Sequence, residues 1–442
     1  MGPGLRLDRA AETRLSDPSR GRFVLSSAVH RLLLALALST LTPASAFADW
    51  KRAESPHFVV YSDGSERSLR DYTLKLERFD ALLTSRFGPG PAEQVRKLPV
   101  YLVADARALR VAIPGLPAGI GGYYSSSEND VFAVLVRGDS DDLLLHEYSH
   151  HVMARSGDDR YPGWLREGFA EYFATATVTP SGQASFGLPG PGRLRALNQS
   201  GWLPMDVVLR ADGSLGINTE TGRTMFYAQS WALTHWLLAD AGRVRALSAY
   251  VAAVNGGRDP VEAWQATYNM TPDQLTAQLR AYLRGRMAYA KLDVPPVNPA
   301  ITVTPLSPAA DVVLLPMINA RSWNPAEVDG PALLNTLRTA AARFPDDPLA
   351  LVALGRAEKR WGDPAAAETA LTRALERQHD NVEGLILMAD LAMERGVDAA
   401  DAAERTRQEA LARDLLRRAL EADPADGRIY SAQARFQRAG FQ

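Results

Sequence analysis

The stretch that decides the fold is Leu143-Leu144-Leu145-His146-Glu147-Tyr148-Ser149-His150-His151-Val152, a His-Glu-x-x-His pattern that follows three leucines. The residues before it, Asp139-Ser140-Asp141-Asp142, supply an N-cap oxygen and negative charge, which predicts that a helix begins here. In a helix, His146 and His150 lie on one face and can both reach one metal ion. Glu147 then lies beside that ion, where a bound water would be, and the leucines anchor the helix in a core.

Two histidines do not complete a catalytic metal site, which has three protein ligands and an open position. The best candidate for the third ligand is Glu167, in the predicted helix Trp164-Leu165-Arg166-Glu167-Gly168-Phe169-Ala170-Glu171. Glu171, one turn later, can accept the second ring N–H of a ligand histidine and fix its tautomer. The alternative is that both glutamates belong to a solvated helix face.

Composition limits the partners and the chemistry. The 442 residues are too many for one ordinary core, so two or three domains are expected. A formal net charge of −2 without a basic block argues against a nucleic-acid partner. The chain has no cysteine, which excludes disulfides and thiolate ligands, so any metal must be held by His, Asp and Glu.

The N-terminus predicts export. Basic residues precede the apolar run at residues 32–38, and the small residues of Ala44-Ser45-Ala46-Phe47-Ala48 follow it. This pattern is typical of a secretory signal peptide over residues 1–48, and the run is much shorter than the ~20 residues that span a bilayer. We therefore expect a periplasmic or secreted protein with no stable membrane span after cleavage of the signal. An uncleaved N-terminal anchor is the alternative.

The region from 49 to 292 combines strand and helix patterns. We expect strands at residues 57–61, 98–103 and 131–136, and a helix through the apolar positions between 69 and 83. Residues 121–124, Gly-Gly-Tyr-Tyr, form an extended segment that could bind a peptide along its edge or could be a plain hairpin bend. Later patterns are helical, at residues 230–238, 243–254 and 272–290. This order predicts an α+β domain, a small sheet lobe followed by a helical lobe, with the metal helix where they join.

Two further segments follow. Six prolines between Asp293 and Pro316 predict a stiff, extended linker, placed at residues 293–327. Residues 328–442 repeat: Leu351, Gly355 and Gly362 recur 34 positions later as Leu385, Ala389 and Gly396. This is the period of tetratricopeptide repeats, in which small residues mark close helix crossings. The next repeat is 11 residues longer, so we expect an insertion around residues 398–408. An ordinary helical domain is the alternative.

The motif residues resemble those of a known family. His146-Glu147-x-x-His150 followed by Trp164-Leu165-Arg166-Glu167-Gly168-Phe169-Ala170 is similar to the gluzincin metallopeptidases. The aminopeptidase N-like group and the bacterial peptidase MA-like proteins with tetratricopeptide repeats are the most similar groups. The resemblance covers residues 50–289 and implies a zincin-like fold with Zn²⁺ bound by His146, His150 and Glu167. It also implies that Tyr227, 60 residues after Glu167, stabilises the oxyanion.

The resemblance implies peptide hydrolysis, in which Glu147 is the general base for a zinc-bound water. The chain departs from the aminopeptidases because residues 121–124 lack the glutamate that holds a substrate's free amine, and because the spacing from His150 to Glu167 is slightly shorter. This favours an endopeptidase or an unusual substrate. The expected partners are a peptide or protein substrate and a protein recruited by the repeats. The alternative is a non-catalytic envelope scaffold with a vestigial or structural zinc site.

Overall fold

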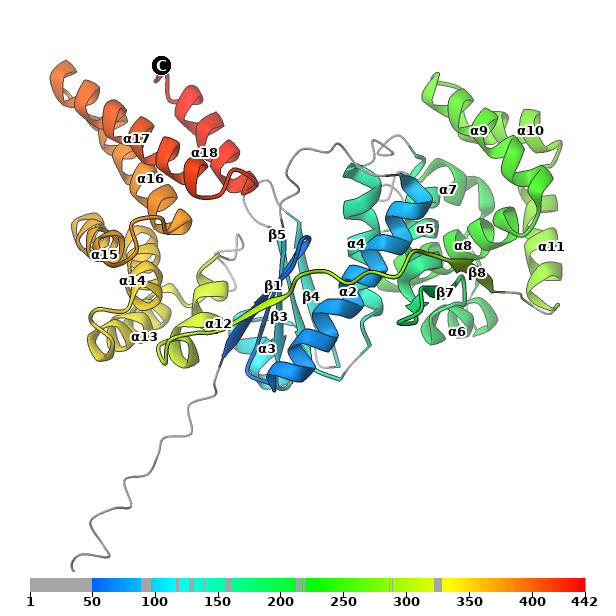
Figure 1. Cartoon of the computed structure of the whole chain (residues 1–442). Helices are drawn as coiled ribbons and strands as arrows, with labels where there is room; N and C mark the ends of the chain where they lie inside the picture. The colour runs from blue at the N-terminus through cyan, green and yellow to red at the C-terminus, as the bar shows by residue number, and fades with distance from the viewer. Residues whose placement is uncertain are drawn as a thin grey trace, which may run out of the picture. The chain divides into compact units, whose positions relative to one another are not determined.

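The computed structural model describes residues 50–88, 97–116, 119–126, 131–138, 140–155, 161–199, 201–211, 217, 219–285, 287, 289–321 and 328–441. The predicted signal peptide at 1–48 lies outside these residues and stays a prediction. Within the described residues, every helix is too short or too polar to cross a membrane. The chain is an α+β protein with a mixed sheet and a helical C-terminal region, as Figure 1 shows.

The main sheet has six strands, in the order β4-β5-β3-β2-β1-β9. Their bounds are β1 Lys51–Glu54, β2 Phe58–Ser62, β3 Leu98–Val103, β4 Gly122–Ser126, β5 Val131–Val136 and β9 Thr302–Pro305. The three inner strands β2, β3 and β5 pair in parallel, whereas every other pairing is antiparallel. The inner strands are continuous apolar runs because helices cover both faces of the sheet. The strands predicted at 98–103 and 131–136 are confirmed.

One face of the sheet packs against α2 (Glu66–Phe87) and α4 (Asp142–Arg155) in a single apolar cluster. Ser65 caps the start of α2 by accepting a hydrogen bond from the backbone N–H of Ser68, and Gly88 ends it with a φ of +85°. The predicted helix at 69–83 is therefore confirmed and extends further at both ends. The opposite face packs against α3 (Ala106–Ala112) and α12 (Ala310–Arg321).

A helical region follows α4. It contains α5 Gly163–Ala174, α6 Pro191–Gln199, α7 Met205–Arg210, α8 Glu220–Leu238, α9 Ala241–Asn255, α10 Pro260–Tyr268 and α11 Pro272–Leu283. A small antiparallel sheet lies among them, formed by β6 Thr177–Val178, β7 Gln183–Phe186 and β8 Ala290–Asp293. The helix predicted at 272–290 is wrong at its end, because α11 stops at Leu283 and the chain then pairs β8 with β7.

The segment predicted as an extended linker at 293–327 forms regular structure over most of its described residues, and that prediction is corrected. β9 pairs with β1 at the edge of the main sheet. α12 contains Pro316, yet Val313, Leu314, Met317 and Ile318 recur at the spacing of a helix face and join the core under the sheet. Burial of this apolar face outweighs the destabilisation that Pro316 causes in the interior of α12.

The C-terminal region consists of helices that pack in sequence. They are α13 Gly330–Arg343, α14 Pro348–Trp361, α15 Pro364–Arg377, α16 Val382–Asp398, α17 Ala402–Ala422 and α18 Gly427–Arg438. The starts of α13 and α15, at 330 and 364, are 34 positions apart, as are those of α14 and α16, at 348 and 382. The extra residues expected as an insertion lengthen helices: α16 has 17 residues and α17 has 21, against 14 in α14 and in α15.

Candidate metal centre

The first part of the site is helix α4, which is fixed by its buried side. Ser140 Oγ accepts a hydrogen bond of 3.1 Å from the backbone N–H of Asp142, where the helix begins. Leu144, Leu145 and Val152 are almost completely buried, whereas Leu143 is 37% exposed, so two of the three leucines anchor the helix. The remaining face presents His146 and His150, whose ring centroids lie 4.8 Å apart.

The second part is helix α5, which packs between α4 and α8. The side chains of Trp164 and Phe173 are buried, which holds α5 in the core and leaves Glu167 facing α4. Gly168 permits a close approach of α8, because a Cβ at this position would lie 2.0 Å from Thr234 Oγ1. The glycine of the Trp-Leu-x-Glu-Gly pattern is thus required by helix packing.

The three predicted ligands converge. The Nε2 atoms of His146 and His150 lie 3.2 Å apart, and each lies 3.2 Å from Oε2 of Glu167. Tetrahedral Zn²⁺ with bonds of ~2.0–2.1 Å keeps its ligand atoms about 3.3–3.4 Å apart. Two imidazole nitrogens and one carboxylate oxygen at this spacing therefore fit a zinc ion, with a fourth position left for water or substrate. No other group of this kind occurs among the described residues.

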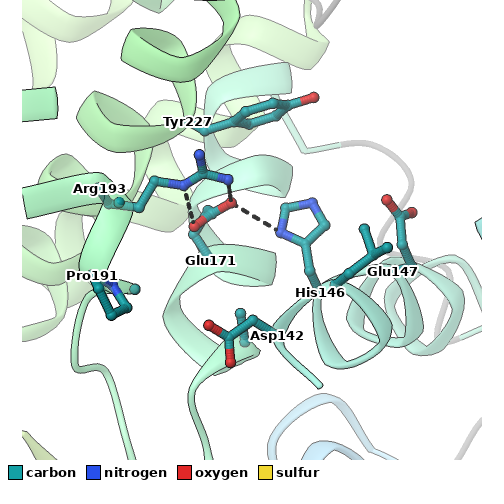
Figure 2. Close-up of a pocket in the computed structure, with 11 residues that line it drawn as sticks. Asp142, His146, Glu147, Glu171, Pro191, Arg193 and Tyr227 are labelled. Carbon is teal, nitrogen blue, oxygen red and sulfur yellow. Dashed lines mark hydrogen bonds and ion pairs between the residues drawn. The ribbon is translucent and has the colours of Figure 1, made fainter. Parts of the chain in front are cut away.

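A second layer of contacts holds His146. Its Nδ1 lies 3.2 Å from Oε1 of Glu171, whose side chain is almost fully buried. The Arg193 guanidinium, from the start of α6, donates to both oxygens of Glu171, with Nε–Oε2 and Nη2–Oε1 distances of 2.8 and 2.5 Å (Figure 2). Glu171 thus lies one turn beyond Glu167 and beside His146, a candidate ligand. Arg193 also lies over the ring of Tyr227, 5.1 Å from its centroid.

The electrostatics of this cluster favour a cation. Burial alone would lower the pKa of His146, but the facing carboxylates of Glu167 and Glu171 outweigh it and raise that pKa to about 10. Burial likewise opposes ionisation of Glu167, but the two histidines lower its pKa to about 2. The His146 pKa rises because the carboxylates create a negative potential at its imidazole nitrogens, which a metal ion would also experience, whereas the Glu167 pKa falls because the imidazoles stabilise its charged form.

Glu147 and Tyr227 line a pocket of about 420 Å³ together with His146, Glu171 and Arg193. Figure 2 shows Glu147 and Tyr227 on different sides of the His146 ring, and the Tyr227 ring centroid lies 5.9 Å from that of His146. Burial raises the pKa of Glu147, and the two histidines only partly oppose this shift. A raised carboxylate pKa is the change that general-base chemistry near neutral pH requires.

Two other histidines near the site have packing contacts. His235 Nδ1 lies 2.7 Å from the Tyr282 hydroxyl, and its side chain is buried against the rings of Tyr172 and Trp231. His151, next to the candidate ligand His150, stacks on Tyr148 with ring centroids 5.6 Å apart. Neither of them lines the pocket.

Sequence reasoning missed Arg193. It lies in Gly190-Pro191-Gly192-Arg193, 22 residues after its partner Glu171, and no helical or strand spacing connects the two. The one available signal is an arginine directly after a Gly-Pro-Gly segment, which is too common to indicate a site.

Residues 143–262, from the second residue of α4 into α10, match the family described as "Protein of unknown function (DUF1570)". This segment contains all three candidate ligands, Glu147, Glu171, Arg193 and Tyr227. No curated protein and no solved structure matches the chain.

Proposed function

We propose that this protein is an exported zinc metallopeptidase of the gluzincin type, with a zincin-like catalytic domain. The observation that carries the proposal is the triangle of His146 Nε2, His150 Nε2 and Glu167 Oε2 with sides of 3.2 Å, beside a pocket that His146, Glu147 and Tyr227 line. A lone His-Glu-x-x-His pattern would not support this function, because it lacks a third ligand and an oxyanion donor.

When bound by His146, His150 and Glu167, Zn²⁺ supplies Lewis-acid chemistry: it acidifies water and polarises a carbonyl oxygen. Glu147 accepts the proton of the attacking water at its carboxylate and returns it to the leaving amine. The Tyr227 hydroxyl donates a hydrogen bond to the carbonyl oxygen as negative charge develops there. Glu171, held by Arg193, accepts the Nδ1 proton of His146 and keeps Nε2 free for the metal.

A peptide substrate is supported by strand β4. It is the outermost strand on its side of the main sheet, and it contacts α4. An unpaired strand edge next to a metal site can align an extended peptide through backbone hydrogen bonds. Gly122 keeps this strand close to its neighbours, since a Cβ there would lie 2.6 Å from Leu135 Cδ2.

The C-terminal helices are proposed to be tetratricopeptide repeats that recruit a protein. The 34-residue spacing of helix starts supports this assignment. So does Gly355, where a Cβ would lie 2.5 Å from Leu371 Cγ of the next helix, as expected at a close crossing. A periplasmic or secreted location follows from the predicted signal peptide.

Substitution of Glu147 by Gln tests the mechanism. The variant keeps the three ligands, so it should bind zinc like the wild type while it loses cleavage of a mixed peptide library followed by mass spectrometry. The cleavage rate should fall about 10²–10⁴-fold, as expected for removal of a general base. Equal cleavage by both proteins would refute the mechanism. A wild-type protein that binds zinc and cleaves no peptide would favour the alternative, a scaffold with a structural zinc site.

A further inference from the structure

Asp142 is a charged residue of the pocket that the mechanism does not use. It is the first residue of α4, four positions before His146, and therefore lies on the same helix face as the two ligand histidines. Figure 2 shows its carboxylate on the side of α4 that faces Pro191. Among the described residues, no hydrogen-bond or ion-pair partner is found for this carboxylate, although it lines the same pocket as Glu147 and Arg193.

The charges around the pocket balance without Asp142. Arg193 is the one cationic side chain among the described lining residues, and both of its bonds to carboxylate go to Glu171. A divalent ion would offset Glu147 and Glu167. Among the described lining residues, the Asp142 carboxylate is then the one unmatched charge, and an unmatched carboxylate in a half-buried site favours a cationic ligand.

The position of Asp142 sets which part of a substrate it can reach. Along a helix, four residues correspond to ~6 Å, so Asp142 lies about one turn from His146. A peptide advances by ~3.3–3.5 Å per residue, so the carboxylate faces a group within about two residues of the reacting bond. Gly190-Pro191-Gly192 also lines the pocket near Asp142, and its two glycines add no side-chain bulk; a Cβ at Gly190 would be in ordinary contact with Asp142 Oδ2, at 3.8 Å.

We propose that Asp142 is a specificity-determining residue, which binds a positively charged group of the substrate next to the scissile bond. The group is an ammonium or guanidinium: a lysine or arginine side chain, or the free α-amino group of a peptide. This inference rests on the proposed function, since it names the substrate class of the same site.

The test uses zinc-loaded full-length protein and hydroxamates, which bind zinc without being cleaved, so that it does not depend on turnover. Four probes separate the sources of charge: the hydroxamates of Nα-acetyl-norleucine (neutral), norleucine (α-ammonium), Nα-acetyl-lysine (side-chain ammonium) and Nα-acetyl-glutamate (anionic). Calorimetry should give at least one cationic probe an affinity about tenfold or more above the neutral probe, as expected for a charge-assisted hydrogen bond. The anionic probe should bind most weakly. Whichever of the two cationic probes binds more tightly shows whether Asp142 binds an α-amino group or a side-chain ammonium group.

Asp142→Asn should remove the preference for the cationic probe and leave the affinity for the neutral probe within about twofold, because the zinc contact is kept. A purely structural role for Asp142, as a negative charge in the first helical turn, would instead change the affinity of all four probes alike. Asp141→Asn is the matched control. It also removes a negative charge at this helix start, but Asp141 is bound to Tyr72 and Lys75, and it does not line the pocket.

Equal affinity of the wild type for the neutral and both cationic probes would overturn the proposal, as would a cationic preference that persists in Asp142→Asn. These outcomes differ from failure of the peptidase function. A protein that shows the preference and its loss in Asp142→Asn, yet cleaves no peptide, would support the binding site and refute the peptidase.

Discussion

The contact between Arg193 and Glu171 should control how tightly the site holds zinc. Arg193→Met keeps an unbranched apolar chain like the aliphatic part of arginine but removes both donors to a carboxylate that is only 5% exposed. Glu171 would keep one partner, His146 Nδ1, at 3.2 Å. Without Arg193, the buried carboxylate of Glu171 is protonated more easily. A protonated Glu171 then orients the His146 ring less firmly. Loss of such an outer contact typically weakens metal affinity about 10–100-fold.

A double-mutant cycle separates this coupling from other effects of the substitution. Zinc affinity is measured by competition with a chromogenic chelator for wild type, Arg193→Met, Glu171→Gln and the double variant. Hydrogen bonds to a buried charged group contribute about 1.5–3 kcal/mol, so we expect a coupling energy of about 2 kcal/mol. Arg195→Met is the matched control, because Arg195 follows on the same helix and is exposed. It should bind zinc like the wild type.

Additive effects of the two substitutions, with a coupling energy below about 0.5 kcal/mol, would refute this reasoning. Arg193 and Glu171 would then act on the metal site independently, despite the two hydrogen bonds between them. A zinc affinity of Arg193→Met equal to that of the Arg195→Met control would refute it as well.

Two further substitutions test the packing around the site and the C-terminal helices. Gly168→Ala places a Cβ 2.0 Å from Thr234 Oγ1 and 2.6 Å from the Ser230 carbonyl oxygen, so α8 must move away from α5. We expect a loss of about 1–3 kcal/mol of unfolding free energy in urea and weaker peptide cleavage. Gly201→Ala, which meets only open space, should leave both unchanged. Glu383→Gln removes the carboxylate that accepts from three guanidinium groups, those of Arg321, Arg356 and Arg428. It should lower the unfolding free energy by about 3–5 kcal/mol, because three buried or half-buried cations lose their shared partner. Glu394→Gln, which removes an exposed pair with Lys359, should cost less than about 1 kcal/mol. Equal stability of the two glutamate variants would contradict this role of Glu383.

The elements closest to the site could be predicted because their signals are local. β3 and β5 are uninterrupted apolar runs, and the ends of α2 carry recognisable capping residues, Ser65 and Gly88. The candidate ligands His146, His150 and Glu167 occur in two short motifs with helical spacing. Their convergence requires only that α4 and α5 pack against each other, as they do.

Other features depend on contacts that no local pattern contains. β1 and β9 are short, partly polar strands whose residues pair across about 250 positions, as in Lys51 with Pro305. The prolines at 293–316 interrupt the helical pattern of α12, so the helix was not predicted. Its apolar face can be recognised as a core face only beside the sheet that it covers. Arg193 and Asp142 acquire their proposed roles from the fold, since the starts of helices α4 and α6 meet at one pocket.

The zinc content of the purified full-length protein tests the central claim most directly. We predict close to one equivalent of zinc per chain in the wild type and in Glu147→Gln, and a large loss of zinc in His150→Ala and Glu167→Ala. Zinc absent from the wild type, or kept at the wild-type level in His150→Ala, would contradict the assignment of His146, His150 and Glu167 as its ligands.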